Sequence, residues 1–250
     1  MALHVLYVTD PACPWSWGAE PVLRRMEAGF GEEVRITYVM GGLWRETRPP
    51  TALAATLDAA AESGMPVDPR LWLDAPPRSS YPACLAVKAA AEQGLDGPYL
   101  RRVREALMCE RVKADTTDAL VALARDVPGM DVERFAVDLG SNAIVEAFGA
   151  DLDVARDVGA DPPAFVVRSE AGRSEGPLAP EGLPAALGAE PQRLPAVEEA
   201  LRRWPRMAVP EVAAVCDLPG PQAPAELWRL ALEWRARPTM FLTGALWSAA

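Results

Sequence analysis

The chain opens with Leu3-His4-Val5-Leu6-Tyr7-Val8-Thr9-Asp10-Pro11-Ala12-Cys13-Pro14-Trp15-Ser16, and this stretch decides the fold. Its first six residues form a short hydrophobic run, which is typical of a buried strand. Thr9-Asp10-Pro11 ends the strand. Beyond the cysteine, apolar residues recur every three or four positions and predict one face of a helix, at Trp15, Ala19, Val22, Met26 and Phe30. Cys13 therefore lies where a strand ends and a helix begins.

The position of Cys13 favours thiol chemistry. Pro14 fits the first helical turn. Free backbone N–H groups and the helix dipole stabilise a negative sulfur at such a position. We therefore expect the pKa of Cys13 to fall from about 8.5 into the range of roughly 3.5–7.5. Ser16 stands where a second cysteine would complete a C-x-x-C disulfide.

The other cysteines and the single histidine do not indicate a metal site. Cys84, Cys109 and Cys216 show no C-x-x-C spacing, so we expect neither a zinc finger nor any other metal site. His4 lies inside the first predicted strand. Its burial there would leave a Cys–His or Ser–His couple without an accessible base.

The charge of the chain bears on its partners. The formal net charge is −10 over 250 residues, and the only lysines are Lys88 and Lys113. We therefore expect no binding to nucleic acid or to an anionic membrane, since both need clustered basic residues. No stretch approaches the roughly 18 apolar residues of a membrane helix, and the N-terminus does not resemble a secretory leader. These features predict a cytoplasmic protein.

The order of elements predicts an α/β fold. Val34 to Met40 reads as a second strand, which would lie parallel to the first after a right-handed crossover. Helical periodicity then dominates residues 51–158. After Pro162-Pro163, Ala164 to Val167 reads as a strand, and Glu170-Ala171-Gly172 as a turn into an edge strand. The pattern indicates a sheet with an all-helical insertion.

Residues 194–250 have a different character. They hold six arginines and six acidic residues, so the excess negative charge lies entirely in residues 1–193. Val209 to Leu218 and Ala225 to Trp234 read as helices, and Pro238 to Trp247 as a strand. Helix, turn, helix and strand predict a small winged-helix-like module. Because its second helix lacks an excess of basic residues, we expect a module for protein contact or packing rather than DNA reading.

Three separated motifs resemble the DsbA family of thioredoxin-fold proteins. They are residues 10–21 around Cys13, Val39-Met40-Gly41-Gly42-Leu43, and residues 80–90 around Cys84. These motifs are similar to those of the cytoplasmic FrnE-like branch of the family, which includes the SpxH/YjbH adaptors. The resemblance implies a thioredoxin-like domain over residues 1–190, with the helical insertion at about 51–158 and the module of residues 194–250 outside it.

The resemblance also implies roles for individual residues. Cys13 matches the family nucleophile, and Pro14 and Trp15 match the dipeptide that tunes its pKa and reduction potential. Pro163 matches the proline, usually cis, that faces the nucleophile. Pro162 departs from the pattern, because the residue before that proline normally pairs with substrate through a backbone N–H, which proline lacks.

Ser16 restricts the chemistry that this resemblance implies. A serine cannot resolve a mixed disulfide, but it can stabilise the Cys13 thiolate. The chemistry would then be monothiol, with glutathione or another small thiol as co-substrate and no required cofactor. Cys84, in the first turn of a predicted helix, is the candidate resolving thiol, and a buried core residue is the alternative. Trp15 and Trp17 are expected to shape an apolar groove around the sulfur.

Three functions follow as hypotheses. The first is a monothiol oxidoreductase that forms mixed disulfides between Cys13 and a protein or small thiol. The second is a non-catalytic SpxH-like adaptor that binds a protein partner, with the C-terminal module as a candidate contact. The third is a relative of kappa-class glutathione transferases or chromene-carboxylate isomerases, which use a serine near the same helix start.

Overall fold

The structure, a computed structural model, describes residues 3–169 and 174–250. The turn predicted at Glu170-Ala171-Gly172 lies outside the described residues.

A four-stranded sheet forms the centre of the N-terminal part. Its spatial order is β2 (Val34–Met40), β1 (Leu3–Thr9), β3 (Ala164–Ser169) and β4 (Ser174–Leu178). β1 runs parallel to β2, as predicted, and antiparallel to β3. The first strand therefore lies inside the sheet, flanked on both sides.

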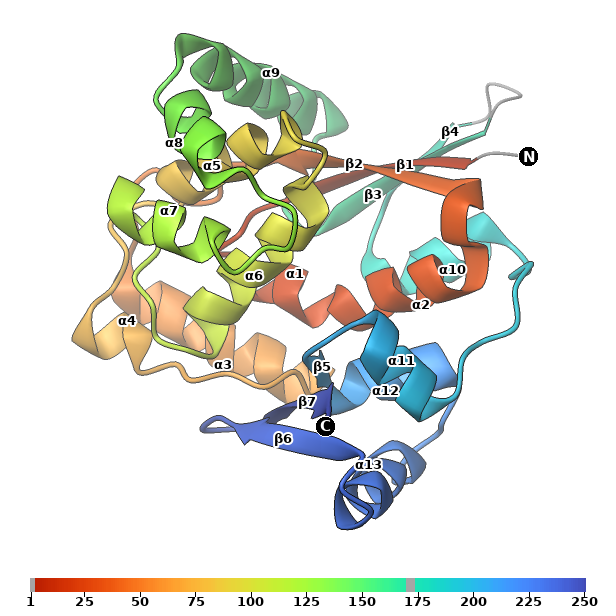
Figure 1. Cartoon of the computed structure of the whole chain (residues 1–250). Coiled ribbons are helices and arrows are strands. Elements are labelled where there is room, and N and C mark those ends of the chain that lie inside the picture. The colour runs from red at the N-terminus through yellow and green to blue at the C-terminus, as the bar shows by residue number, and fades with distance from the viewer. Residues whose placement is uncertain (1–2, 170–173) are drawn as a thin grey trace.

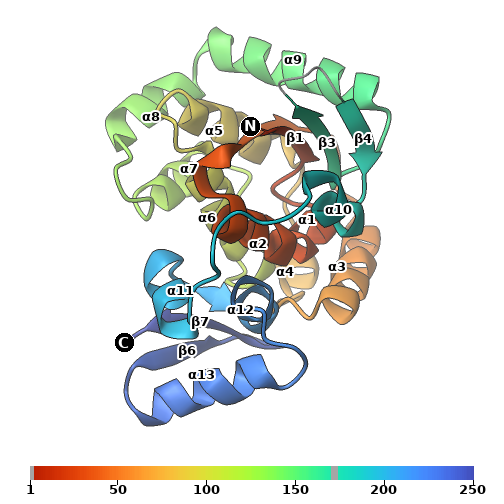
Figure 2. The same ribbon diagram turned by 90° about the vertical axis from the view of Figure 1, so that its right-hand side faces the viewer.

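The two faces of this sheet are covered by different helices. Side chains alternate along β1, so Val5 and Tyr7 point to one face and Leu6 and Val8 to the other. The first face packs against α2 (Glu20–Phe30) and α10 (Leu183–Leu187), and the second against α9 (Asn142–Val158). Figures 1 and 2 show these helices on opposite sides of the sheet.

The helix predicted after Cys13 is in fact two helices. α1 (Pro14–Gly18) ends before Ala19, and α2 begins at Glu20. Pro21 is the physical reason, because it has no N–H to donate to the carbonyl of Trp17 four residues earlier. Two short turns of 3₁₀ helix also occur, Gly31–Glu33 after α2 and Pro180–Gly182 before α10.

The middle of the chain is helical, as the periodicity predicted. Its helices are α3 (Pro49–Ser63), α4 (Leu71–Asp74), α5 (Tyr81–Ala91), α6 (Asp96–Met108), α7 (Thr117–Ala124), α8 (Val132–Leu139) and α9. α3 begins at Pro49, two residues before the predicted start of the helical segment at residue 51, because proline is tolerated in a first helical turn. The insertion has its own core, in which the rings of Tyr99 and Phe135 lie 5.0 Å apart.

The C-terminal part forms a separate small sheet with three helices. Its elements are α11 (Val197–Arg203), β5 (Met207–Ala208), α12 (Val209–Cys216), α13 (Gln222–Leu232), β6 (Ala236–Met240) and β7 (Ala245–Ala249). The strands pair antiparallel in the order β5-β7-β6. We call residues 194–250 the C-terminal module, and its order of elements is winged-helix-like.

One strand prediction for this module was wrong. Residues 238–247 form a hairpin rather than a single strand, because the chain reverses between Phe241 and Gly244. A contact from a distant loop holds the reversal: the hydroxyl of Thr243 accepts a hydrogen bond from the Val67 backbone at 2.7 Å. The periodicity of the sequence could not predict this contact, because the two residues are far apart in the chain.

A buried cluster of charges joins the module to the rest of the molecule. The guanidinium of Arg101 on α6 donates to both carboxylate oxygens of Glu211 on α12, at 2.8 and 3.0 Å. It also donates to Glu20 on α2 at 3.1 Å and to Glu105 on α6 at 2.8 Å. Arg101 and Glu211 are both buried. Three helices from distant parts of the chain therefore meet at one side chain.

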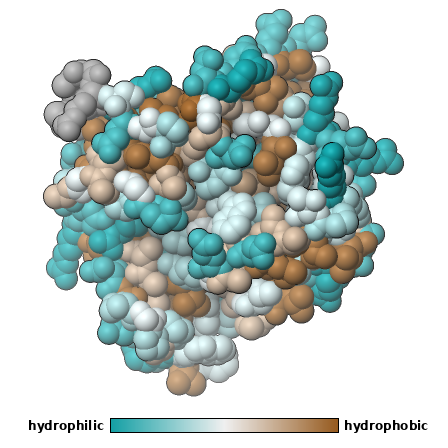
Figure 3. All heavy atoms as spheres, turned by 180° about the vertical axis from the view of Figure 1, so that it is seen from behind, coloured by the Kyte–Doolittle hydropathy of each residue, from teal (hydrophilic) through white to brown (hydrophobic). Residues whose placement is uncertain are grey.

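The surface mixes polar and apolar groups. On the face shown in Figure 3, hydrophobic patches lie scattered among hydrophilic ones. Among the residues that the structure describes, no helix is both long and apolar enough to cross a membrane.

We predict that Glu211→Ala destabilises the protein by about 3–5 kcal/mol, because it leaves the buried Arg101 guanidinium without its bidentate partner. Urea unfolding followed by circular dichroism measures the change. Glu226→Ala, which removes a half-exposed partner of Arg229, serves as the control and should have a much smaller effect. Equal effects of the two substitutions would contradict the prediction.

Candidate functional site

Cys13 caps the first helix. Its sulfur accepts a hydrogen bond from the backbone N–H of Ser16 at 3.4 Å, the geometry of an N-cap. Its S–H donates to the carbonyl of Pro162, also at 3.4 Å, and the Pro162–Pro163 peptide bond is cis. The structure thus brings Cys13, Ser16 and the proline pair together from segments about 150 residues apart.

The expectation of a lowered pKa for Cys13 was wrong. The side chain is only 1% exposed. Burial raises the pKa of Cys13 above its ordinary value, and the Asp10 carboxylate raises it further. Hydrogen bonds from Ser16 and the charge of Arg104 lower this pKa, but by less than burial and Asp10 together raise it. The thiol is therefore protonated at neutral pH, because desolvation of the charged form outweighs the stabilising groups at the helix start.

Ser16 acts on the sulfur through its backbone. Its side chain also lowers the pKa of Cys13, but the buried hydroxyl makes no hydrogen bond of normal geometry with any described residue. The backbone carbonyl of Ser16 accepts a hydrogen bond from Tyr7 at 3.4 Å. Ser16 is therefore fixed in the core.

The two tryptophans near Cys13 lie in different environments. Trp15 is 38% exposed, so its ring is available beside the site. Trp17, by contrast, is buried, and its ring nitrogen donates to the Pro66 carbonyl at 3.0 Å. The Arg101 guanidinium lies 4.5 Å from the centre of its ring. The prediction that Trp17 shapes a groove around the sulfur was therefore wrong. Trp17 packs between the insertion and the C-terminal module.

Asp10 is the residue at this site that the sequence analysis missed. It is fully buried, and its carboxylate accepts hydrogen bonds from Ala12 N–H at 2.8 Å, Leu43 N–H at 2.7 Å and the Ser80 hydroxyl at 2.7 Å. Burial raises the pKa of Asp10, while these hydrogen bonds lower it. Asp10 therefore connects the loop before Cys13 to the loop after β2 and to the start of α5. In the sequence, Asp10 lies next to Pro11, and this pattern predicted only the end of a strand.

Cys84 belongs to the Asp10 cluster. Its S–H donates to the same carboxylate at 3.3 Å, and the side chain is fully buried. Burial, followed by the charge of Asp10, raises the pKa of Cys84 well above its ordinary value. A protonated thiol is a poor nucleophile. The role of Cys84 as a resolving thiol stays a prediction, and its environment does not favour it.

Arg104 is a buried cation whose charge lowers the pKa of the Cys13 thiol. Its guanidinium donates to the Thr9 hydroxyl and pairs with Glu20 at 2.5 Å. Burial alone would raise the pKa of Glu20, but Arg101, Arg104 and Arg24 together lower it to about 2. A signal for Arg104 existed in the sequence, since it interrupts the apolar face of α6. Periodicity alone does not say what such a charge contacts.

In residues 3–169 and 174–250, no three His, Cys, Asp or Glu side chains converge as metal ligands would.

Known proteins resemble this chain in both sequence and fold. The profile of the thioredoxin family matches residues 6–180. The chain belongs to the thioredoxin family. Among curated members of similar sequence, the "ClpXP adapter protein SpxH" of Halalkalibacterium halodurans is 29% identical, over 98% of this chain and 88% of the relative.

Solved thioredoxin-like structures share the fold over a smaller part of the chain. A putative protein disulfide isomerase from Nitrosomonas europaea has a TM-score of 0.66 at 20% identity, covering 75% of this chain and 96% of its own. The cytosolic disulfide reductase DsbM of Pseudomonas aeruginosa has a TM-score of 0.59 at 24% identity, covering 69% and 87%. This member of the thioredoxin family is thus DsbA-like in fold and SpxH-like in sequence.

We predict slow alkylation of Cys13 by iodoacetamide at pH 7. Because burial raises its pKa, the rate should keep rising above pH 9 in the folded protein. A variant with alanine at Cys84, Cys109 and Cys216 isolates the reaction, and the same variant in urea should titrate near the free value of about 8.5. A rate that reaches its plateau below pH 7 in the folded protein would contradict the prediction.

We predict that Asp10→Ala destabilises the fold by about 2–6 kcal/mol, because two buried N–H groups lose their acceptor. Urea unfolding measures the change. Asp153→Ala removes an exposed carboxylate of the same type and should have little effect. If both substitutions have the same small effect, Asp10 does not hold this loop in place.

Proposed function

We propose that this protein is a non-catalytic SpxH-like adaptor, which works in the cytoplasm and delivers a protein partner to the ClpXP protease. The observation that carries the proposal is the burial of Cys13, which raises the pKa of its thiol, with Ser16 in place of a second thiol. A DsbA-like fold with such a site is suited to binding rather than to rapid thiol exchange.

The extent of the sequence likeness supports the same proposal. The SpxH relative matches 98% of this chain, and therefore most of the C-terminal module. The two solved structures cover 75% and 69% of the chain. The SpxH relative therefore matches more of this chain than either solved structure does.

The C-terminal module carries a candidate contact surface, which we name the α13 patch. It consists of Trp228, Leu232 and Trp234, with exposed fractions of 53%, 82% and 88%. Large aromatic and aliphatic side chains are seldom left this exposed, and they dominate the energy of protein interfaces. The nearby Arg229 is paired with Glu226 and Glu233, so the patch offers apolar area rather than free cations.

We predict that the protein speeds the degradation of Spx by ClpXP in a reconstituted assay. Cys13→Ala should keep this activity under reducing conditions, because binding needs no covalent step. Leu232→Ser combined with Trp234→Ala should lower it at least about tenfold through loss of apolar contact area. Leu73→Ser, on an exposed leucine of α4, is the matched control.

The opposite pattern favours catalysis. If Cys13→Ala abolishes partner capture, and capture by the unmodified protein survives only without reductant, the adaptor proposal fails.

A second candidate is the monothiol oxidoreductase. One observation favours it: the Ser16 N–H points at the Cys13 sulfur, as it would to stabilise a thiolate. The thiolate would attack glutathione disulfide, forming the Cys13–glutathione bond and releasing one glutathione thiolate. Mass spectrometry after incubation with glutathione disulfide tests this, with Cys13→Ala as the control. The transferase-like alternative has less support, because the Ser16 hydroxyl is buried.

A further inference from the structure

One face of the central sheet is only partly covered. α9 packs over this face through Ala155 and Val158, which contact Val8 and its neighbours toward the C-terminal end of β1. In Figure 1 the strands run on beyond α9, toward the N-terminus of the chain. There, the side chains of Arg35 and Thr37 on β2 are exposed. The N-terminal half of β1 and the strands beside it therefore present an open surface, which we call the open face.

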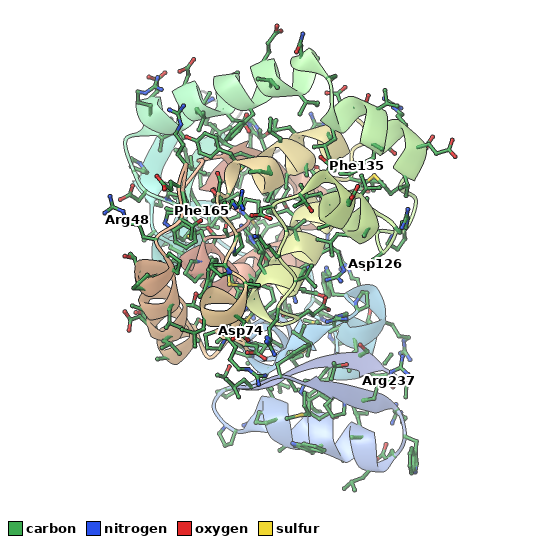
Figure 4. The ribbon with its side chains drawn as sticks, turned by 90° about the vertical axis from the view of Figure 1, so that its left-hand side faces the viewer. Arg48, Asp74, Asp126, Phe135, Phe165 and Arg237 are labelled. Atoms are coloured by element: carbon green, nitrogen blue, oxygen red, sulfur yellow. The ribbon has the colours of Figure 1, made fainter. Side chains whose placement is uncertain are left out.

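The alternation of side chains shows which residues of β3 belong to the open face. Phe165 and Val167 point to the opposite face, where the ring of Phe165 stacks on Tyr7 with the ring centres 4.4 Å apart. Figure 4 shows Phe165 among the side chains inside the molecule, where it is fully buried. Because successive side chains of a strand point to opposite faces, Val166 and Arg168 belong to the open face.

Three basic side chains form one row across the open face. His4 on β1 lies directly opposite Arg35 on β2 and directly opposite Arg168 on β3. Residues paired in this way on neighbouring strands point to the same face of the sheet. Since neighbouring strands lie about 4.8 Å apart, the backbones of the two arginines are separated by about 10 Å, with His4 between them. We call Arg35, His4 and Arg168 the basic row.

His4 is held at the surface of the sheet. The sequence predicted that its side chain would be buried, but it is only half-buried, so that prediction was wrong. The reason is that α9 does not extend over this end of β1. A hydrogen bond of 2.8 Å joins its Nε2 to the hydroxyl of Thr37. The only histidine of the chain is thus fixed on the open face between two guanidinium groups.

The basic row has no acidic neighbour in the register of the sheet. Ser174 on β4 lies opposite Arg168, and the next row toward α9 consists of Thr37, Leu6 and Val166. Within the described residues, neither arginine of the row forms an ion pair. The chain has 35 acidic residues and 25 Lys and Arg, so the open face is basic in an otherwise acid-rich protein.

The arrangement of the row favours an anion from outside. Like charges directly opposite each other destabilise a sheet, so the row is unfavourable for folding whenever His4 is protonated. An anion bound over the row removes this repulsion. Exposed guanidinium groups pair well with carboxylates, because their planar donors match the two carboxylate oxygens. The open face is therefore complementary to a pair of carboxylates.

The charge of the whole chain favours a short anionic partner over a long one. A net charge of −10 repels polyanions such as nucleic acid and anionic membranes. Membrane-binding clusters hold about four to eight basic residues, more than this row provides. In an extended peptide, side chains at alternate positions share a face and lie about 7 Å apart. Two acidic residues so spaced are within reach of both long arginine side chains.

We propose that the basic row binds an extended acidic segment of a partner protein. Two carboxylates of the segment pair with Arg35 and Arg168, and the imidazole of His4 lies between them. His4 is near the start of β1 and Cys13 follows the end of that strand, so this surface is separate from the thiol site. The proposal does not depend on the adaptor function, because the test measures binding directly.

The test uses the full-length protein without a histidine tag and two short peptides that carry an uncharged dye. One peptide alternates serine with glutamate, and the other alternates serine with glutamine. Fluorescence anisotropy measures binding. We expect the glutamate peptide to bind saturably and the glutamine peptide not to bind. Raising the salt from about 50 to 500 mM should weaken binding at least about fivefold, because exposed ion pairs are screened.

Matched variants locate the binding site. Arg35→Gln and Arg168→Gln should each weaken binding about two- to fivefold, and together about tenfold. Arg237→Gln removes an exposed arginine of β6 and should leave the affinity unchanged. Figure 4 shows Arg237 on the C-terminal module, far from Phe165 on β3. Thermal unfolding checks that each variant folds, and we expect little change in Tm because all three side chains are exposed.

A measurement on the unmodified protein keeps the test decisive if a variant does not fold. Because His4 is the only histidine, its imidazole C–H protons give unique signals in a proton NMR spectrum. The glutamate peptide should shift these signals saturably, and the glutamine peptide should not.

Several results would overturn the proposal. It fails if the two peptides bind alike, if the double variant binds as tightly as the unmodified protein, or if the glutamate peptide binds without moving the His4 signals. It also fails if single-stranded DNA or anionic vesicles bind more tightly than the glutamate peptide, or if inorganic phosphate displaces that peptide at equal concentration. Loss of a dimer in the double variant would assign the surface to a second copy of this chain instead.

Discussion

The arrangement of this molecule depends on the buried guanidinium of Arg101. It donates to carboxylates on three helices, Glu20 on α2, Glu105 on α6 and Glu211 on α12. Burying such charges is costly, and only a near-complete set of partners offsets the cost. A partly assembled molecule would leave Arg101 or a glutamate unpaired. The cluster therefore specifies how the thioredoxin-like layer, the insertion and the C-terminal module fit together.

A second buried charge organises the loop that carries the thiol. Asp10 accepts hydrogen bonds from its own loop, from the loop after β2 and from the residue that precedes α5, and so places Cys13 at the start of α1. The same carboxylate raises the pKa of Cys13 and of Cys84. The interaction that positions the sulfur thus works against its ionisation. Such a site keeps the loop in a fixed conformation but does not activate the thiol, which agrees with the proposed adaptor function.

Local sequence patterns predicted most elements of the fold. The runs of β1 and β2, their parallel pairing and the helical insertion followed from periodicity and connectivity. The errors arose where a contact with a distant residue, or a missing backbone N–H donor, determines the local structure. Pro21 divides the helix after Cys13 at Ala19, because it has no N–H to donate to the Trp17 carbonyl four residues earlier. The hairpin near Thr243 depends on a contact with Val67, and Trp17 is buried by a module that lies more than 180 residues away in the sequence.

The sequence by itself determined the class of fold and the place of Cys13 at a junction of strand and helix. These properties depend on residues that are close together in the sequence, so the sequence alone is enough to predict them. Only the tertiary structure decided that Cys13 stays protonated, that Asp10 and Arg101 connect the parts of the molecule, and that two arginines flank His4 on the central sheet. Desolvation and charge pairing depend on atoms brought together from distant segments, and no local pattern records which segments will meet.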